Sequence, residues 1–208
     1  MIMKGKVYIA SMNLRGEWAS LPNKNIKRVN VTSAQRKKNP FRIAFSPMTE
    51  IEGGYKGYNC FENYWQSGKR YEGFDKKDTI EQIKWWKKQS KGKRKYPKGK
   101  NKKVLYSTFD ENNKKLNYIE SRKKIYVPEY FNLIKNKRIL YNLKKELEQG
   151  KDIAIYDFDG VRTNKGNPTI KELSLELLKI KINDAKHIFG HGYIVGSYLL
   201  GLEPKDYI

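Results

Sequence analysis

The stretch Ile153-Ala154-Ile155-Tyr156-Asp157-Phe158 is apolar and β-prone, and it predicts a buried strand. Before it, apolar residues recur at helical spacing, and Pro128 suits the first turn of that helix. These apolar residues are Phe131, Ile134, Leu140, Leu143 and Leu147. After it, Thr169 to Ile182 has a helical period, and Asp184 is placed to cap a last helix from Ala185 to Leu200.

Towards the N-terminus the same analysis gives three shorter strand candidates: Val7 to Met12, Arg28 to Thr32 and Phe41 to Phe45. A glycine-rich turn from Glu52 to Tyr58 leads into a helix from about Phe61 to Tyr71. Strands and helices alternate, so the sequence predicts the α/β or α+β class. A length of 208 residues predicts one compact domain, 1–208.

The charge of the chain is strongly unbalanced. There are 44 basic and 22 acidic residues, which gives a net charge of +22 and a pI near 9.8. Such an excess indicates a polyanionic partner, and nucleic acid is the usual one because contact with its phosphates releases counterions. Two alternatives remain open at this point: compositional drift in a Lys- and Asn-rich chain, and a small anionic substrate.

Residues 84–103 form a basic loop segment that no acidic residue interrupts. Its predicted phosphate-binding residues are Lys87, Lys88, Lys91, Lys93, Arg94, Lys95 and Lys98. Gly92, Pro97 and Gly99 predict a loop for its second half. Trp85, Trp86 and Tyr96 lie among the cations, a pattern that favours phosphate contact with bases stacked on rings. The alternative is a solvated, self-repelling loop.

The composition excludes several classes of site. Cys60 is the only cysteine, so an internal disulfide is excluded and a reducing compartment is favoured, the cytoplasm or, for a viral protein, the host cytoplasm. With one cysteine and two histidines, no zinc site of the Cys/His type is available, and no metal or cofactor is expected. No stretch reaches the roughly 18 apolar residues of a membrane span, and no signal peptide is expected.

The stretch Asn59-Cys60-Phe61-Glu62-Asn63-Tyr64-Trp65-Gln66-Ser67-Gly68-Lys69-Arg70-Tyr71 carries the most structured motif. On one continuous helix, Glu62, Gln66 and Lys69 would share a face, while Trp65 would point elsewhere. A carboxylate, an amide and an ammonium on one face could bind a sugar and supply acid–base catalysis. The alternative is an ordinary salt-bridged surface.

This motif resembles the glutamate-histidine-tyrosine…glutamine…lysine helix of the NADAR family of N-glycosidases. Glu62, Gln66 and Lys69 match residue by residue, Asn63 replaces the usual histidine, and the match covers about a dozen residues. The resemblance implies a NADAR-like domain with the basic loop as an insertion, and cleavage of an N-glycosidic bond to ribose. Family members act on ADP-ribosylated guanine or on riboflavin-pathway intermediates.

On this reading the chain is a glycosidase or ADP-ribosyl hydrolase that removes ADP-ribose from DNA or RNA, or acts on a phosphorylated ribose. Glu62 and Lys69 are the expected catalytic residues, assisted by Asp157 and Asp159 at the end of the buried strand. The expected substrate-binding residues are Trp65, Gln66, Asn59 and His191. The alternative function is a non-catalytic nucleic-acid-binding accessory protein of a virus or phage.

Two further patterns lie near the C-terminus. Asp157 to Val161 resembles the first motif of haloacid-dehalogenase-type phosphatases, but the 48 residues that follow Gly160 are too few for the later motifs. A strand followed by an Asx-type turn is the simpler interpretation. His187 and His191 are spaced i, i+4 on the predicted last helix, where one could approach a substrate or both could lie in the core.

Overall fold

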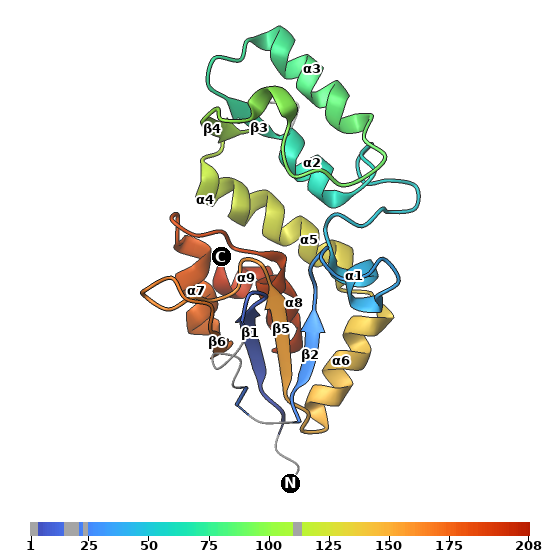
Figure 1. Ribbon diagram of the computed structural model, residues 1–208, viewed down its shortest axis with the longest axis vertical. Coiled ribbons are helices and arrows are strands. Elements are labelled where there is room, and N and C mark those ends of the chain that lie inside the picture. Colours follow the sequence, from blue (N-terminus) through green and yellow to red (C-terminus); the bar gives the residue numbers. More distant parts are fainter. Residues whose placement is uncertain (1–3, 15–20, 23–24, 110–113) are drawn as a thin grey trace. The chain divides into compact units, whose positions relative to one another are not determined.

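The computed structural model describes residues 4–14, 21–22, 25–109 and 114–208 and divides into two compact units (Figure 1). The sheet unit comprises Met1–Ser46 and Val127–Ile208, and the inserted unit comprises Pro47–Tyr126. Helices and strands are mixed, in agreement with the predicted α/β or α+β class. The prediction of one NADAR-like domain stays a prediction, and the basic residues 84–103 belong to the inserted unit.

The sheet unit is built on a four-stranded sheet with the order β2-β5-β1-β6 (Figure 1). β1 (Val7–Ser11), β2 (Lys27–Asn30) and β5 (Ile153–Asp157) are parallel, and β6 (Ile170–Glu172) is antiparallel to β1. Burial of β1 and most of β5 agrees with the apolar, β-branched composition of central parallel strands. The strand predictions at Val7, Arg28 and Ile153 are therefore confirmed to within two residues at each end.

Helices pack on this sheet through aliphatic side chains. α5 (Val127–Ile134) and α6 (Arg138–Glu148) replace the single predicted helix, and Leu140, Leu143 and Leu147 are all buried. α8 (His191–Leu199) lies against β1 and β5. Gly192 allows the close approach, since a Cβ there would lie 2.8 Å from Asp157 Cβ of β5 and 3.2 Å from Ile9 Cδ1 of β1. α9 (Pro204–Tyr207) ends the chain.

Three element predictions in this unit were wrong. Residues 41–45 form α1 (Pro40–Phe45), because the Asn39 side chain accepts hydrogen bonds from Phe41 N–H and Arg42 N–H and Pro40 suits the first turn. The helix predicted from Thr169 begins only at α7 (Leu175–Asn183), capped by Ser174, because β6 precedes it. The last helix begins at His191, not Ala185.

The inserted unit combines short helices with a two-stranded antiparallel sheet. Its elements in order are α2 (Phe61–Ser67), β3 (Lys69–Tyr71), α3 (Lys76–Lys87), η2 (Pro97–Gly99), β4 (Val104–Ser107), α4 (Tyr118–Ser121) and η3 (Arg122–Tyr126). The helix predicted over 61–71 was therefore too long. Gly68 ends it because the strand pair β3–β4 begins there, with Thr108 N–H donating to Gly68 O.

Buried polar groups hold the turn between α2 and β3. The Gln82 side chain of α3 is fully buried, and its amide donates to Ser67 O at 3.2 Å and Lys69 O at 2.9 Å. The predicted glycine turn is present, with φ between 75° and 80° at Gly53, Gly54 and Gly57. In the described part of the chain, no helix has the length and apolar character needed to cross a membrane.

Cys60, the residue before α2, gives a direct test of packing in the inserted unit. Its side chain is fully buried, and burial raises the pKa of the thiol from 9.0 to about 11. Between these values the unfolded chain loses the proton and the folded chain keeps it, so stability falls as pH rises. We expect the free energy of unfolding to fall by about 2–3 kcal/mol more in the wild type than in Cys60→Ala between pH 9 and 11.

Chemical denaturation at several pH values measures this difference. A thiol reagent gives an independent readout, because the native thiol should react far more slowly than the thiol of the unfolded chain. Equal rates in both states would contradict the burial of Cys60.

Candidate functional site

Helix α2 brings Glu62 and Gln66 together. They are one turn apart, and the Gln66 amide donates a hydrogen bond of 2.6 Å to Glu62 Oε1. The Glu62 backbone N–H donates to Pro47 O at 2.9 Å, which fixes the first turn of the helix. The carboxylate and the amide therefore act as one polar group, as the sequence predicted.

Lys69 reaches the same neighbourhood from β3, not from the helix. Burial lowers the pKa of its ammonium group, the carboxylate of Glu62 raises it, and the charge of Lys95 lowers it further. The prediction of a shared helix face was wrong for Lys69, because Gly68 ends the helix first. Glu62 and Lys69 nevertheless interact electrostatically, and Lys95 of the basic segment acts on the same ammonium group.

Trp65 lies in the core of the inserted unit. Its side chain is 8% exposed, and its ring is stacked on Phe109 with centroids 5.5 Å apart and planes at 9°. Tyr126 is tilted against it at 5.0 Å. A substrate could stack on Trp65 only by displacing these rings, so the structure gives this residue a packing role in place of the predicted binding role.

Two asparagines, one in α2 and one in the turn before it, hold the basic segment. Asn59 Nδ2 donates to Ser90 O at 2.5 Å, and Asn63 Nδ2 donates to Lys91 O at 3.2 Å. Asn63 Oδ1 also accepts from Lys93 N–H at 2.9 Å, and its side chain is fully buried. Asn59, predicted to bind substrate, thus holds a loop. Asn63 is the residue at which the motif departs from the family, and its role in holding the loop was not predicted from the sequence.

The basic surface consists of the cationic side chains of residues 84–103, all of which are exposed. They are Lys84, Lys87, Lys88, Lys91, Lys93, Arg94, Lys95, Lys98, Lys100, Lys102 and Lys103. Lys98 pairs with Glu81 at 2.8 Å. The first three lie at the C-terminal end of α3 and the others on the anchored loop, η2 and the approach to β4, so the loop predicted for the second half is confirmed.

The aromatic residues of the same segment do not share this surface. Trp86 is fully buried and Tyr96 is 3% exposed. Trp85 is half-buried, with its ring edge-on to Trp86 at 4.8 Å and to Tyr96 at 5.4 Å. The predicted interleaving of cations with base-stacking rings was therefore wrong: the rings form the core beneath the cations.

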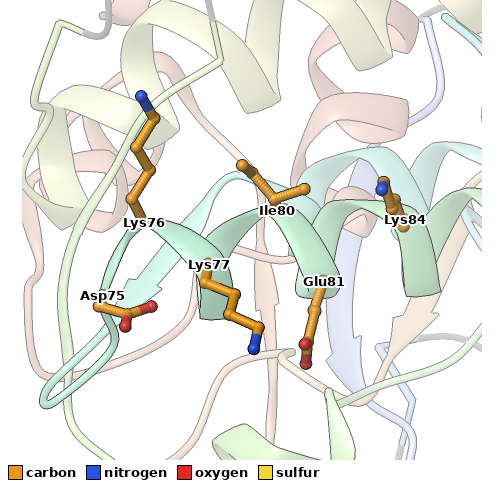
Figure 2. Close-up of a pocket in the computed structure, with 6 residues that line it drawn as sticks. All are labelled: Asp75, Lys76, Lys77, Ile80, Glu81 and Lys84. Carbon is orange, nitrogen blue, oxygen red and sulfur yellow. The ribbon is translucent and has the colours of Figure 1, made fainter.

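An open depression runs along α3 (Figure 2). Its lining residues are Asp75, Lys76, Lys77, Ile80, Glu81 and Lys84. All come from one helix and its N-cap, and they carry both signs of charge. None of the predicted catalytic residues lines this depression.

In the sheet unit, the end of β5 meets the start of α8. Asp157 is 1% exposed, and its Oδ2 accepts from Gly192 N–H at 2.7 Å, so it caps the helix across space. Its Oδ1 is buried without a hydrogen-bond partner among the described residues. Cβ atoms on Gly190 and Gly192 would lie 2.5 Å from Asp157 Oδ2 and 2.8 Å from its Cβ, so only glycine fits on either side.

His191 joins this carboxylate to β2. Its Nε2 lies 2.9 Å from Val31 O and must carry the hydrogen, because a carbonyl oxygen only accepts. Its Nδ1 lies 3.4 Å from Asp157 Oδ2 and forms an ion pair when protonated. His187 is not on this helix: it lies in the turn after α7, where its Nδ1 is 2.7 Å from Asp184 Oδ2. The shared helix predicted for the two histidines was wrong.

The structure thus assigns the predicted catalytic residues to two units. Glu62 and Lys69 lie in the inserted unit, and Asp157 and Asp159 in the sheet unit. Asp157 is committed to capping α8, while Asp159 is half-buried in the following turn. Within the described residues, no group of three or more His, Cys, Asp or Glu side chains is arranged to hold a metal ion.

The comparisons of this chain with protein-family models, with curated proteins and with solved structures found no match. The resemblance to the NADAR family consequently rests on the dozen residues around Glu62.

The capping role of Asp157 predicts a hierarchy of stabilities. Asp157→Ala removes the acceptor for Gly192 N–H and should lower the free energy of unfolding by about 0.5–2 kcal/mol. Gly192→Ala should cost about 1–3 kcal/mol through overpacking. Asp157→Asn keeps an acceptor oxygen and should lower the free energy of unfolding least. Urea denaturation measures all three, and an Asp157→Ala variant as stable as the wild type would contradict the cap.

Proposed function

We propose that this protein binds nucleic acid through the basic surface of the inserted unit. One observation carries the proposal: Asn63 of α2 and Asn59 of the turn before it anchor the basic segment, yet its cations all face solvent. The two hydrogen bonds of the buried Asn63 side chain fix the backbone of the segment, whereas a solvated, self-repelling loop would be free to move. Fixing the backbone beforehand lowers the entropy that binding would otherwise cost.

The charges that surround the segment support the same partner. No acidic residue lies between Lys84 and Lys103, and Glu81 pairs with Lys98 at an exposed position. Exposed pairs are weak and compete poorly with phosphate. The net charge of +22 would add long-range attraction to any polyanion.

Salt dependence tests this proposal. The combined variant Lys91→Gln, Lys93→Gln, Lys95→Gln should weaken binding to a labelled duplex and flatten the plot of log affinity against log salt by up to about 2.7, at about 0.9 per phosphate contact. The matched control is Lys165→Gln, Lys179→Gln, Lys186→Gln, which changes the net charge equally at exposed positions of the sheet unit. Fluorescence anisotropy gives both slopes, and equal slopes for the two variants would contradict the proposal.

N-glycoside cleavage is the second candidate function. It is favoured by the Glu62–Gln66 hydrogen bond and by Lys69, whose pKa is lowered by burial beside that carboxylate. A carboxylate can stabilise the positive charge that develops on a ribose ring, and a less basic amine can attack an opened sugar. The resemblance to the NADAR family supports the same chemistry.

Glu62→Gln tests this chemistry, because it keeps the shape of the side chain and loses its charge. Turnover of ADP-ribosylated DNA, ADP-ribosylated protein or NAD should fall by about 10²-fold or more, with kcat affected more than KM. Lys69→Met should weaken the binding of phosphate-bearing substrates or block a covalent step. Thermal melts establish that both variants fold, and wild-type turnover in both would remove the glycosidase candidate.

A further inference from the structure

We infer that the basic surface takes double-stranded nucleic acid by its phosphates, independently of sequence, and does not stack single-stranded bases. The inference rests on the proposed function and specifies its ligand. Proteins that hold single strands combine a cationic groove with aromatic rings on which successive bases stack. On residues 84–103 of this protein the cations all face solvent, whereas the aromatic rings are turned inward.

The half-buried Trp85 is the only candidate platform within the segment. Trp86 and Tyr96 already contact its ring edge-on at 4.8 Å and 5.4 Å. These contacts make Trp85 part of the aromatic cluster beneath the loop.

The remaining partly exposed rings of the inserted unit, within its described residues, each have a cation or another ring against them. Four are covered by cations: Tyr55 by Lys56 at 5.8 Å, Phe74 by Lys102 at 5.0 Å, Tyr106 by Lys115 at 4.9 Å and Tyr118 by Arg122 at 4.4 Å. The last, Phe109, is stacked on Trp65. A base that stacked on the occupied face of any of these rings would have to displace a favourable cation–π or ring contact.

Phosphate contact alone favours the duplex. Double-stranded DNA presents one charge per about 1.7 Å of axis, and each phosphate contact contributes about 0.9 to its salt slope against about 0.7 for a single strand. For about six contacts the slopes differ by about 1.2, so lowering the salt from 1 M to 0.1 M should raise the ratio of duplex to single-strand affinity about 15-fold. Phosphate contacts carry no sequence information directly.

The experiment compares a 24-base-pair duplex with each of its single strands and with a duplex of shuffled sequence. The protein carries Trp18→Phe, so that the three remaining tryptophans, Trp65, Trp85 and Trp86, all lie in the inserted unit. We expect the ratio of duplex to single-strand affinity to rise about 15-fold between 1 M and 0.1 M salt, equal affinity within twofold for the shuffled duplex, and unchanged tryptophan emission on saturation. Trp85→Leu, or Trp85→Phe if the first variant melts early, should leave the duplex affinity unchanged.

The outcomes separate the inference from the proposed function. The inference is overturned if a single strand binds as tightly as the duplex or more tightly, and if it quenches tryptophan emission in the wild type but not in the Trp85 variants. Nucleic-acid binding itself would then remain. A clear preference for one duplex sequence overturns its sequence-independent part. Equal salt slopes for the Lys91, Lys93, Lys95 variant and its sheet-unit control overturn the proposed function, and the inference with it.

Discussion

Pairing of β5 with β1 on one side and β2 on the other is the interaction on which the sheet unit depends. Val7 lies opposite Ile153 in the register, so segments 146 residues apart must meet before the sheet exists. The inserted unit, Pro47–Tyr126, falls within the connection from β2 to β5. Such long-range parallel pairing forms slowly.

In both units, buried polar side chains from elsewhere in the chain supply hydrogen-bond partners for buried backbone groups. Asp157 satisfies an N–H at the start of α8, Gln82 satisfies carbonyls at the end of α2, and Asn63 satisfies both kinds of group in the basic loop. Each such bond is modest, but leaving its partner unsatisfied in the interior would cost about 1–3 kcal/mol. These side chains therefore specify where loops lie, which is why they occur beside the candidate sites.

Periodicity and composition were sufficient to predict the strands at Val7, Arg28 and Ile153, the aliphatic core of α6 and the basic loop. They failed where a local cap or a distant partner decided the outcome. Asn39-Pro40 made a helix of an apolar run, Gly68 ended α2 because β4 pairs with the residues that follow, and Asp157 set the start of α8. Lys69 lies on β3 and not on the helix with Glu62 and Gln66, yet the Glu62 carboxylate still raises the pKa of its ammonium group.

The inward position of the aromatic rings also explains how so concentrated a charge is tolerated. Eleven cations over twenty residues repel one another, and repulsion favours an expanded loop. Burial of Trp86 and Tyr96, together with the asparagine anchors at Ser90, Lys91 and Lys93, opposes that expansion from below. The same rings cannot both hold the loop and stack on bases. The rings that stabilise the cationic surface are therefore the ones that our inference excludes from stacking on a single strand.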